Sequence, residues 1–274
     1  MAETYNFYKI EKKGSIARVI LNNPAKRNAM GPDAWKEIMP IFYDLHNDAS
    51  IRAIILSAEG PMFSAGIDLI GMAAEMGPIA AGDRSAGSTR KVYDIIFPLQ
   101  DAITCVEKCC KPVICCIHGK CIGAGLDLAS ACDIRLATQD VSISLRETAV
   151  GFVADVGSLQ RVSLIVGQGI AREMAYTAKF IDAQRSKEVN LVNEIYPDKE
   201  TMLKAAEEMA AQIAANSPLA VQASKEVLNY CRGKSIAEGL EYVAARSAMI
   251  VPSNDLMESI NSFMEKRKPN FPGN

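Results

Sequence analysis

The spacing of apolar residues divides the chain into a first part rich in strands and a last third made of helices. Short apolar runs that end at Gly, Asn or Pro predict strands, and apolar residues that recur every three or four positions predict helices. The expected strands cover residues 7–12, 17–21, 53–56, 113–117, 133–137 and 142–145. The expected helices cover residues 31–45, 91–109, 157–165, 168–177, 199–215, 218–231 and 235–266.

One pattern occurs twice: a buried strand, a loop with several glycines, and a helix, at residues 53–69 and 113–131. Such units predict a repeated βα core whose loops gather at the strand ends, where ligands usually bind in α/β sheets. Residues 77–90, rich in Gly, Ala, Ser and charge, are expected to form a mobile loop. The helical last third is expected to act as a cover or an assembly surface.

Composition narrows the class of protein. The chain has 274 residues, 49% of them apolar and 23% charged, with a formal net charge of −2. This apolar content excludes global disorder, and no apolar run reaches the roughly 20 residues of a membrane helix. The near-neutral charge argues against nucleic acid as the main partner. Neither end carries a recognisable targeting signal, so we expect the protein to stay where it is made.

The cysteines and histidines do not indicate a metal site. Seven of the eight cysteines lie between Cys105 and Cys132, in apolar stretches and without a Cys-x-x-Cys pair. We therefore expect buried, reduced thiols in a reducing compartment. The two histidines, His46 and His118, stand far apart without a ligand motif. His118 could serve a cysteine nucleophile, but a polar residue at the end of a strand is the simpler interpretation.

Most phosphate-loop and nucleophile motifs are absent, and Gly123-Ala-Gly125 matches a nucleotide loop only in part. What remains is two glycine-rich turns, whose backbone N–H groups could bind an oxyanion, and three carboxylates, Asp127, Glu147 and Asp155. Asp155 lies in a stretch with no other charge, and two interpretations stay open. It could cap the helix that follows Gly157, or it could transfer protons with a pKa raised by burial.

Three motifs resemble the enoyl-CoA hydratase/isomerase (crotonase) superfamily, and the resemblance runs from about residue 10 to residue 268. They are Ser64-Ala-Gly-Ile-Asp68, Gly123-Ala-Gly-Leu-Asp-Leu-Ala-Ser-Ala-Cys-Asp-Ile-Arg135 and Ala154-Asp-Val-Gly-Ser-Leu-Gln-Arg161. The resemblance implies an α/β fold, a crotonase-like spiral of ββα units over residues 1–197. It also implies a helical oligomerisation region over residues 198–274, which would form a homotrimer or a dimer of trimers.

The resemblance further implies acyl-CoA thioester chemistry through a stabilised enolate, with no cofactor beyond the coenzyme A of the substrate and no metal. The oxyanion donors would be the backbone N–H groups of Ile67 and Ala124. Ala124 stands where the family commonly has glycine, which matters only if the turn needs a positive φ. Other substrate-binding positions would be Ser64, Ala65, Gly66 and Asp68.

The three carboxylates point to one branch of the superfamily. Crotonase-type hydratases place two glutamates twenty residues apart, where this chain has Asp127 and Glu147, and then glycine where it has Asp155. The Asp/Glu/Asp set resembles dienoyl-CoA isomerases, which convert 3,5-dienoyl-CoA to 2,4-dienoyl-CoA in fatty acid β-oxidation. Glu147 and Asp155 would then be the base and the acid, in an order left open, and Asp127 would tune the pair. Thr148 departs from this branch, since the animal enzymes are expected to carry an acidic residue there.

Two alternatives remain at this stage. A 2-enoyl-CoA hydratase would use Asp127 and Glu147 to activate water, and a non-catalytic or RNA-associated member of the fold would use neither. The basic tail with Lys266 and Lys268 would bind the CoA phosphates, from a neighbouring subunit in much of the family. A solvated helix end with favourable dipole placement explains the same residues. By family, a mitochondrial or peroxisomal matrix is as suitable a location as the cytoplasm.

Overall fold

A twisted sheet of six strands forms the centre of the molecule, in a computed structural model that describes residues 5–72 and 86–274. The strand order is β1-β2-β3-β4-β6-β9, with β1 antiparallel to β2 and the other neighbours parallel. The bounds are β1 Tyr8–Lys13, β2 Ile16–Leu21, β3 Ala53–Ala58, β4 Val113–Ile117, β6 Ile134–Thr138 and β9 Glu194–Tyr196. A second sheet joins β5 (Lys120–Ile122), β7 (Ser142–Ser144) and β8 (Ile181–Asp182).

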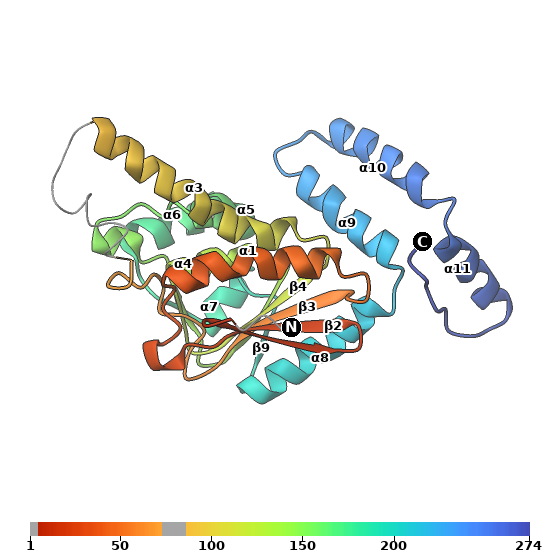
Figure 1. Cartoon of the computed structure of the whole chain (residues 1–274), viewed down its shortest axis with the longest axis horizontal. Helices are drawn as coiled ribbons and strands as arrows, with labels where there is room; N and C mark the ends of the chain where they lie inside the picture. The colour runs from red at the N-terminus through yellow and green to blue at the C-terminus, as the bar shows by residue number, and fades with distance from the viewer. Residues whose placement is uncertain (1–4, 73–85) are drawn as a thin grey trace.

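Helices cover both faces of the large sheet. On one face lie α1 (Pro32–Asn47) and α3 (Ala86–Lys108), and on the other lies α8 (Lys199–Ala214), as Figure 1 shows. Alternate residues of β3 follow this arrangement: Ile54 belongs to the core cluster with α1 and α3, and Ile55 belongs to the cluster with Met202 and Ala206 of α8. Because both faces of the sheet are covered, every residue of β3 and β4 is buried, and both strands are mostly apolar without alternating polar residues.

The remaining helices fall into two groups. Around the core lie α4 (Ala124–Ser130), α5 (Ser158–Val166), α6 (Gln168–Thr177), α7 (Ala183–Glu188) and two 3₁₀ turns, Pro24–Lys26 and Glu147–Val150. The last three, α9 (Pro218–Tyr230), α10 (Ile236–Ile250) and α11 (Asn254–Met264), extend to one side of the core in Figure 1. None of the helices in the described ranges is both long and apolar enough to cross a membrane.

The helix predicted over residues 235–266 is wrong as a single element, because it is divided into α10 and α11. Pro252 lies at the break and has no backbone N–H to continue the hydrogen bonds of α10. Ser253 then starts α11 by accepting a hydrogen bond from the backbone N–H of Leu256 at 3.3 Å. Local chemistry therefore explains the break, although the apolar spacing continues across it.

Three other expectations are corrected. No helix lies within residues 59–69, where bridges and turns follow β3, and the expected turn of residues 119–125 contains the strand β5. The helix expected from Lys91 already begins at Ala86, so the predicted loop of residues 77–90 is wrong at its end. The rest of that loop, residues 77–85, lies outside the described residues. The elements β8, α7 and β9 were not predicted, since strands of two or three residues carry no periodic signal.

The eight cysteines are all free thiols, five of them buried. Burial raises the pKa of Cys109 to about 11 and that of Cys116 to about 12, so these thiols stay protonated at neutral pH. They pack as small apolar side chains. The division of the chain at residues 197 and 198 stays a prediction, although α8 packs on the central sheet.

Candidate active site

Two glycine-containing loops meet next to the start of α4. Ser64 forms a parallel bridge with Cys121: the Ser64 N–H donates to Lys120 O at 3.1 Å, and the Ile122 N–H donates to Ser64 O at 3.1 Å. Gly66 has a φ of 95°, and a Cβ atom built on it would lie 2.9 Å from Ile122 O and 3.8 Å from the backbone nitrogen of Ala124. The loops approach so closely that residue 66 must be glycine.

This approach brings two backbone donors together. Ala124 is the first residue of α4, so its N–H has no acceptor within the helix. Within residues 5–72 and 86–274, neither the N–H of Ala124 nor that of Ile67 has a hydrogen-bond acceptor. The positive φ of this turn, 50°, falls on Gly123 and not on Ala124, so alanine is accommodated without strain. Two unpaired donors therefore adjoin one small space.

The space is a cavity of about 80 Å³ that both donor residues and all three carboxylates line. Its walls are otherwise apolar and come from α1, α3 and the segment between β7 and α5. The lining residues are Trp35, Ile67, Leu69, Leu99, Ala124, Asp127, Glu147, Val150, Phe152, Val153, Asp155 and Val156. Residues separated by more than a hundred positions thus form one site.

Asp127 is the most deeply buried of the carboxylates, with 1% of its surface exposed. It projects from α4, and its Oδ1 accepts a hydrogen bond of 2.6 Å from the backbone N–H of Ser158, the first residue of α5. The pKa of Asp127 is raised to about 7, chiefly by burial and also by the charge of Glu147, against the lowering effect of the hydrogen bond from Ser158. Asp127 thus satisfies the N-terminus of another helix and carries a proton readily near neutral pH.

Glu147 begins the short 3₁₀ turn after β7, and its Oε2 is buried without a hydrogen-bond partner in the described structure. A Cβ atom on Gly123 would lie 2.9 Å from the other oxygen, Oε1. The carboxyl group therefore lies against the turn that presents the Ala124 N–H. Burial raises the pKa of Glu147, and the charge of Asp155 adds to this effect. An unsatisfied buried oxygen of this kind is typical of a group that acts on a ligand.

Asp155 lies on the segment between Glu147 and α5, with part of its surface exposed. Partial burial raises the pKa of the Asp155 carboxyl group. Its backbone oxygen accepts a hydrogen bond of 2.6 Å from Gln100 Nε2 of α3, which holds the segment in place. The capping interpretation of Asp155 is wrong: Gly157 precedes α5 without a side-chain cap, and Asp127 bonds the N-terminus of that helix instead. The proton-transfer interpretation remains.

The other predicted binding residues lie behind the cavity wall. Ser64 Oγ donates to Asn28 O at 2.7 Å and accepts from the Gly66 N–H at 3.1 Å, so Ser64 and Gly66 shape the loop. Asp68 accepts from the Gly71 N–H at 2.8 Å and pairs with Lys26 at 3.1 Å, and both contacts lower its pKa. Neither Ser64, Ala65, Gly66 nor Asp68 is among the residues that line the cavity.

Lys266 and Lys268 follow the end of α11 and are exposed. They do not line the cavity that holds the carboxylates.

Sequence reasoning missed the apolar wall of the small cavity, above all Phe152 and Val153. Both are large apolar side chains that remain exposed beside Asp155. The only signal in the sequence was that Asp155 stands in an otherwise apolar stretch.

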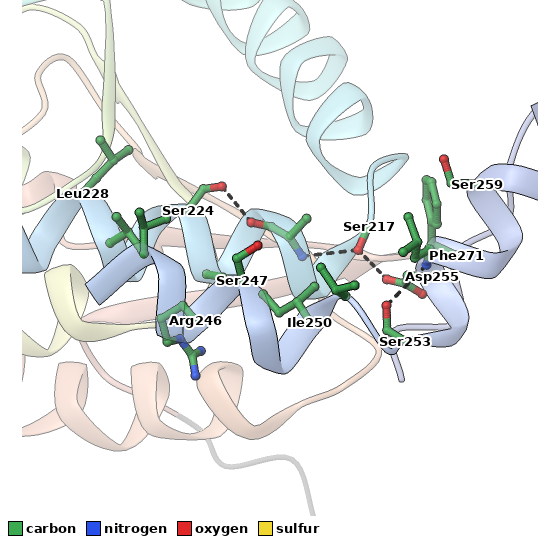
Figure 2. A pocket seen from close by; sticks show the side chains of 16 residues that line it. Ser217, Ser224, Leu228, Arg246, Ser247, Ile250, Ser253, Asp255, Ser259 and Phe271 are labelled. Atoms are coloured by element: carbon green, nitrogen blue, oxygen red, sulfur yellow. Dashed lines mark hydrogen bonds between the residues drawn. The ribbon is translucent and has the colours of Figure 1, made fainter. Parts of the chain in front are cut away.

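A larger groove of about 640 Å³ lies among α9, α10 and α11. Figure 2 shows hydrogen bonds among some of the groups there: Ser217 bonds Asp255, and Ser224 Oγ donates to Ala220 O at 2.8 Å. Aliphatic side chains such as Leu228 and Ile250 make up most of the wall. This groove suits apolar packing, whereas the small cavity holds the three carboxylates.

The chain is similar in sequence to known proteins. Residues 11–274 match the family described as enoyl-CoA hydratase/isomerase. A protein of Dictyostelium discoideum named mitochondrial Δ(3,5)-Δ(2,4)-dienoyl-CoA isomerase is 42% identical over 272 residues, which cover 97% of this chain and 92% of that protein. A protein of Arabidopsis thaliana with the same name, but peroxisomal, is 36% identical and covers 98% of each chain.

Solved structures show the same architecture. An enoyl-CoA hydratase from Bacillus anthracis has a TM-score of 0.88 at 28% identity, covering 98% of this chain and 100% of that one. A putative enoyl-CoA hydratase from Streptomyces coelicolor A3(2) has a TM-score of 0.90 at 25% identity, covering 100% of this chain and 97% of that one. The fold class predicted from the sequence is confirmed.

Proposed function

The chain belongs to the enoyl-CoA hydratase/isomerase family, and from this premise we propose that its small cavity isomerises 3,5-dienoyl-CoA to 2,4-dienoyl-CoA. The enzyme is a Δ(3,5)-Δ(2,4)-dienoyl-CoA isomerase of fatty acid oxidation, as its relatives at 36% and 42% identity are named. The observation that carries the proposal is local. Two unpaired backbone N–H groups and three carboxylates with raised pKa values share one apolar cavity.

The reaction moves two double bonds by one position. A proton leaves C2, the electron pair of that C–H bond enters the conjugated chain as a dienolate, and C6 takes up a proton. The N–H groups of Ile67 and Ala124 would donate to the thioester oxygen as negative charge develops there. One such donor typically lowers the barrier by about 3 kcal/mol.

The position of Glu147 supports an assignment of the two proton-transfer groups. Its carboxyl group lies against the turn of Gly123, next to the Ala124 donor, so it adjoins the place of the thioester. We therefore assign Glu147 as the base at C2. Asp155 lines the same cavity from the segment that leads to α5 and is assigned as the acid at C6. The two sites are several bond lengths apart, which two groups serve better than one.

Asp127 would tune this pair without touching the substrate carbon. Burial and the charge of Glu147 raise the pKa of Asp127, which couples the two carboxyl groups, and the hydrogen bond from Ser158 to Asp127 joins α4 to the start of α5. The cavity of about 80 Å³ is smaller than the roughly 300 Å³ of a typical small ligand site, so it would enclose the reacting diene and not the whole acyl-CoA.

The proposal is tested by incubation with a 3,5-dienoyl-CoA while the absorbance of the 2,4-conjugated product is followed. We expect turnover in the wild type, and a loss of turnover without loss of CoA binding in Glu147→Gln. Hydration of crotonyl-CoA without any isomerisation would contradict the proposal and favour the hydratase alternative. Asp155 is among the residues that line the cavity, which supports the isomerase over the hydratase alternative.

The C-terminal helices support an oligomer. Side chains such as Leu228, Leu240 and Phe263 are exposed and apolar on α9, α10 and α11. Monomers rarely expose so many large apolar side chains in one region, so we propose a homotrimer or a dimer of trimers through this region. Lys266 and Lys268 would then reach the CoA phosphates of a neighbouring subunit. Light scattering of the purified protein measures the subunit number.

The proposed reaction needs only the acyl-CoA substrate and no added cofactor. The described residues contain no group of three or more His, Cys, Asp or Glu side chains that could hold a metal ion. Relatives are named mitochondrial and peroxisomal. An organelle matrix is therefore the proposed location, with the cytoplasm as the alternative that imaging of a tagged full chain would distinguish.

A further inference from the structure

A second cavity lies on the far side of Asp155. It has a volume of about 360 Å³ and is lined by residues of α3, of α5 and of the segment 155–157, and by Arg232, which follows α9. Asp155 and Val156 line both this cavity and the small apolar one. The chain at Asp155 and Val156 therefore borders both cavities.

The second cavity differs from the first in its chemistry. Most of its lining side chains are polar or charged: Gln100, Thr104, Glu107, Gln160, Arg161 and Arg232. Its volume is enough for roughly ten water molecules at about 30 Å³ each. Gln160 and Arg232 are exposed, so the cavity meets bulk solvent at their end.

Ion pairs join several of the side chains that line this cavity. Arg161 Nε pairs with Glu107 at 2.5 Å, and its Nη2 donates to Thr104 Oγ1 at 3.0 Å. Arg232 pairs with the other oxygen of Glu107. Because Glu107 is bonded to both arginines and Arg161 is largely buried, these side chains form a fixed polar wall.

Glu147 has no such opening. Its Oε2 is buried and without a partner, its Oε1 lies against Gly123, and it does not line the second cavity. The two proton-transfer groups therefore differ in their access to water. Residue Asp155 borders the polar cavity as well as the apolar one, so it keeps a border with the polar cavity when the acyl chain fills the apolar cavity, whereas Glu147 borders only the apolar cavity.

This difference matters because the reaction leaves the enzyme in a changed state. Glu147 starts as a carboxylate and gains the proton from C2. Asp155 starts as an acid and loses its proton to C6. Before the next forward turnover, Glu147 must lose one proton and Asp155 must gain one, so the proton balance needs a route for each.

We propose that the polar cavity between α3 and α5 is a solvent port that reprotonates Asp155, so that the hydrogen added at C6 comes from water and not from C2. The inference rests on the proposed isomerase function and deepens it. Glu147 releases its proton separately, after the product has left the apolar cavity. The water molecule that gives a proton to Asp155 becomes hydroxide, which leaves through the open end near Gln160 and is neutralised in bulk solvent by the proton that Glu147 releases.

The experiment follows hydrogen isotopes during many turnovers. The full-length protein converts 3,5-octadienoyl-CoA in D₂O at saturating substrate, where the enzyme spends little time empty. Mass spectrometry and NMR of the product measure the deuterium at C6. The wild type is expected to give nearly one deuterium atom at C6 per product molecule. Product that carries the former C2 hydrogen at C6 would contradict the proposal that water reprotonates Asp155 through this cavity.

Gln160→Phe narrows the cavity at its open end, on a residue that touches neither donor nor carboxylate. We expect the deuterium at C6 to fall by about half at saturating substrate and to recover at low substrate, where the empty enzyme has time to exchange. Gln168→Phe is the matched control, because Gln168 is exposed at the start of α6 and does not line the cavity. It should behave as the wild type.

The outcomes separate the two proposals. Turnover with unchanged deuterium in Gln160→Phe would refute the port while the isomerase function stands. Absence of dienoyl-CoA turnover in the wild type would refute the function itself. A circular dichroism spectrum of each variant verifies that it is folded, so a folded Gln160→Phe protein with wild-type labelling counts against the port.

Discussion

The core and the C-terminal helices satisfy their polar groups in different ways. In the core, Asp127 of α4 bonds the start of α5, and Gln100 of α3 bonds the backbone of Asp155. In the C-terminal region, Ser217, Ser235 and Ser253 each accept from a backbone N–H three residues along the same chain. The start of α5 thus depends on a contact from a distant segment, whereas the starts of α9, α10 and α11 are capped locally. These three helices also leave large apolar side chains exposed.

The largest expected effect falls on catalysis in the core. Asp155→Asn keeps the size and the backbone contact to Gln100 but cannot supply the proton at C6. We expect kcat for 3,5-dienoyl-CoA to fall by about 10³-fold, within the range for loss of a general acid. The melting temperature should hold, since the Asp155 side chain caps no helix. Activity within ten-fold of the wild type would remove Asp155 from the mechanism.

The second prediction tests whether the exposed apolar faces of α9, α10 and α11 form the contact between subunits. Phe263 of α11 is 85% exposed, and Phe263→Asp would place a charge in the proposed contact between subunits. We expect light scattering to give a monomer in place of a trimer. Tyr43→Asp is the control, because Tyr43 is 71% exposed on α1 of the core. If both variants keep the wild-type mass, the C-terminal faces are not the interface.

The third effect is a pH dependence of stability. The pKa of Asp127 is about 7 in the folded protein, above the unfolded value of about 3.9. The folded state therefore binds the proton more tightly, and this contribution is present at low pH and lost as pH rises from about 4 through 7. In Asp127→Asn we expect this loss, a few kcal/mol at most, to be absent. Urea unfolding at pH 5 and pH 8 measures it, and an equal pH slope in both proteins would contradict the prediction.

The smallest effect belongs to a local cap. Ser253→Ala removes the acceptor for the Leu256 N–H at the start of α11. Removal of such a cap typically costs about 1 kcal/mol. Amide hydrogen exchange should increase in α11 and stay unchanged in α1 and α3, which would confirm that the C-terminal helices depend on short-range contacts. Faster exchange in the core as well would show that the two regions are coupled.

The sequence predicted elements well where a local signal was strong. The strand at residues 113–117 agrees with β4 residue for residue, because an apolar run lies between Pro112 and the turn at Gly119. The carboxylate spacing indicated a set of three, and the structure brings all three to one cavity. What depended on distant contacts was missed, such as the cap of α5 by Asp127 and the apolar wall with Phe152.

Residue 123 carries a consequence for anyone who alters this protein. A methyl group there would press on Glu147, and the backbone at Gly123 has a φ that other residues rarely adopt. Tailoring the pocket to a longer or bulkier acyl chain should therefore begin at Phe152 and Val153 on the opposite wall, where side chains face open space. At position 123 the absence of a side chain leaves room for the carboxyl group of Glu147.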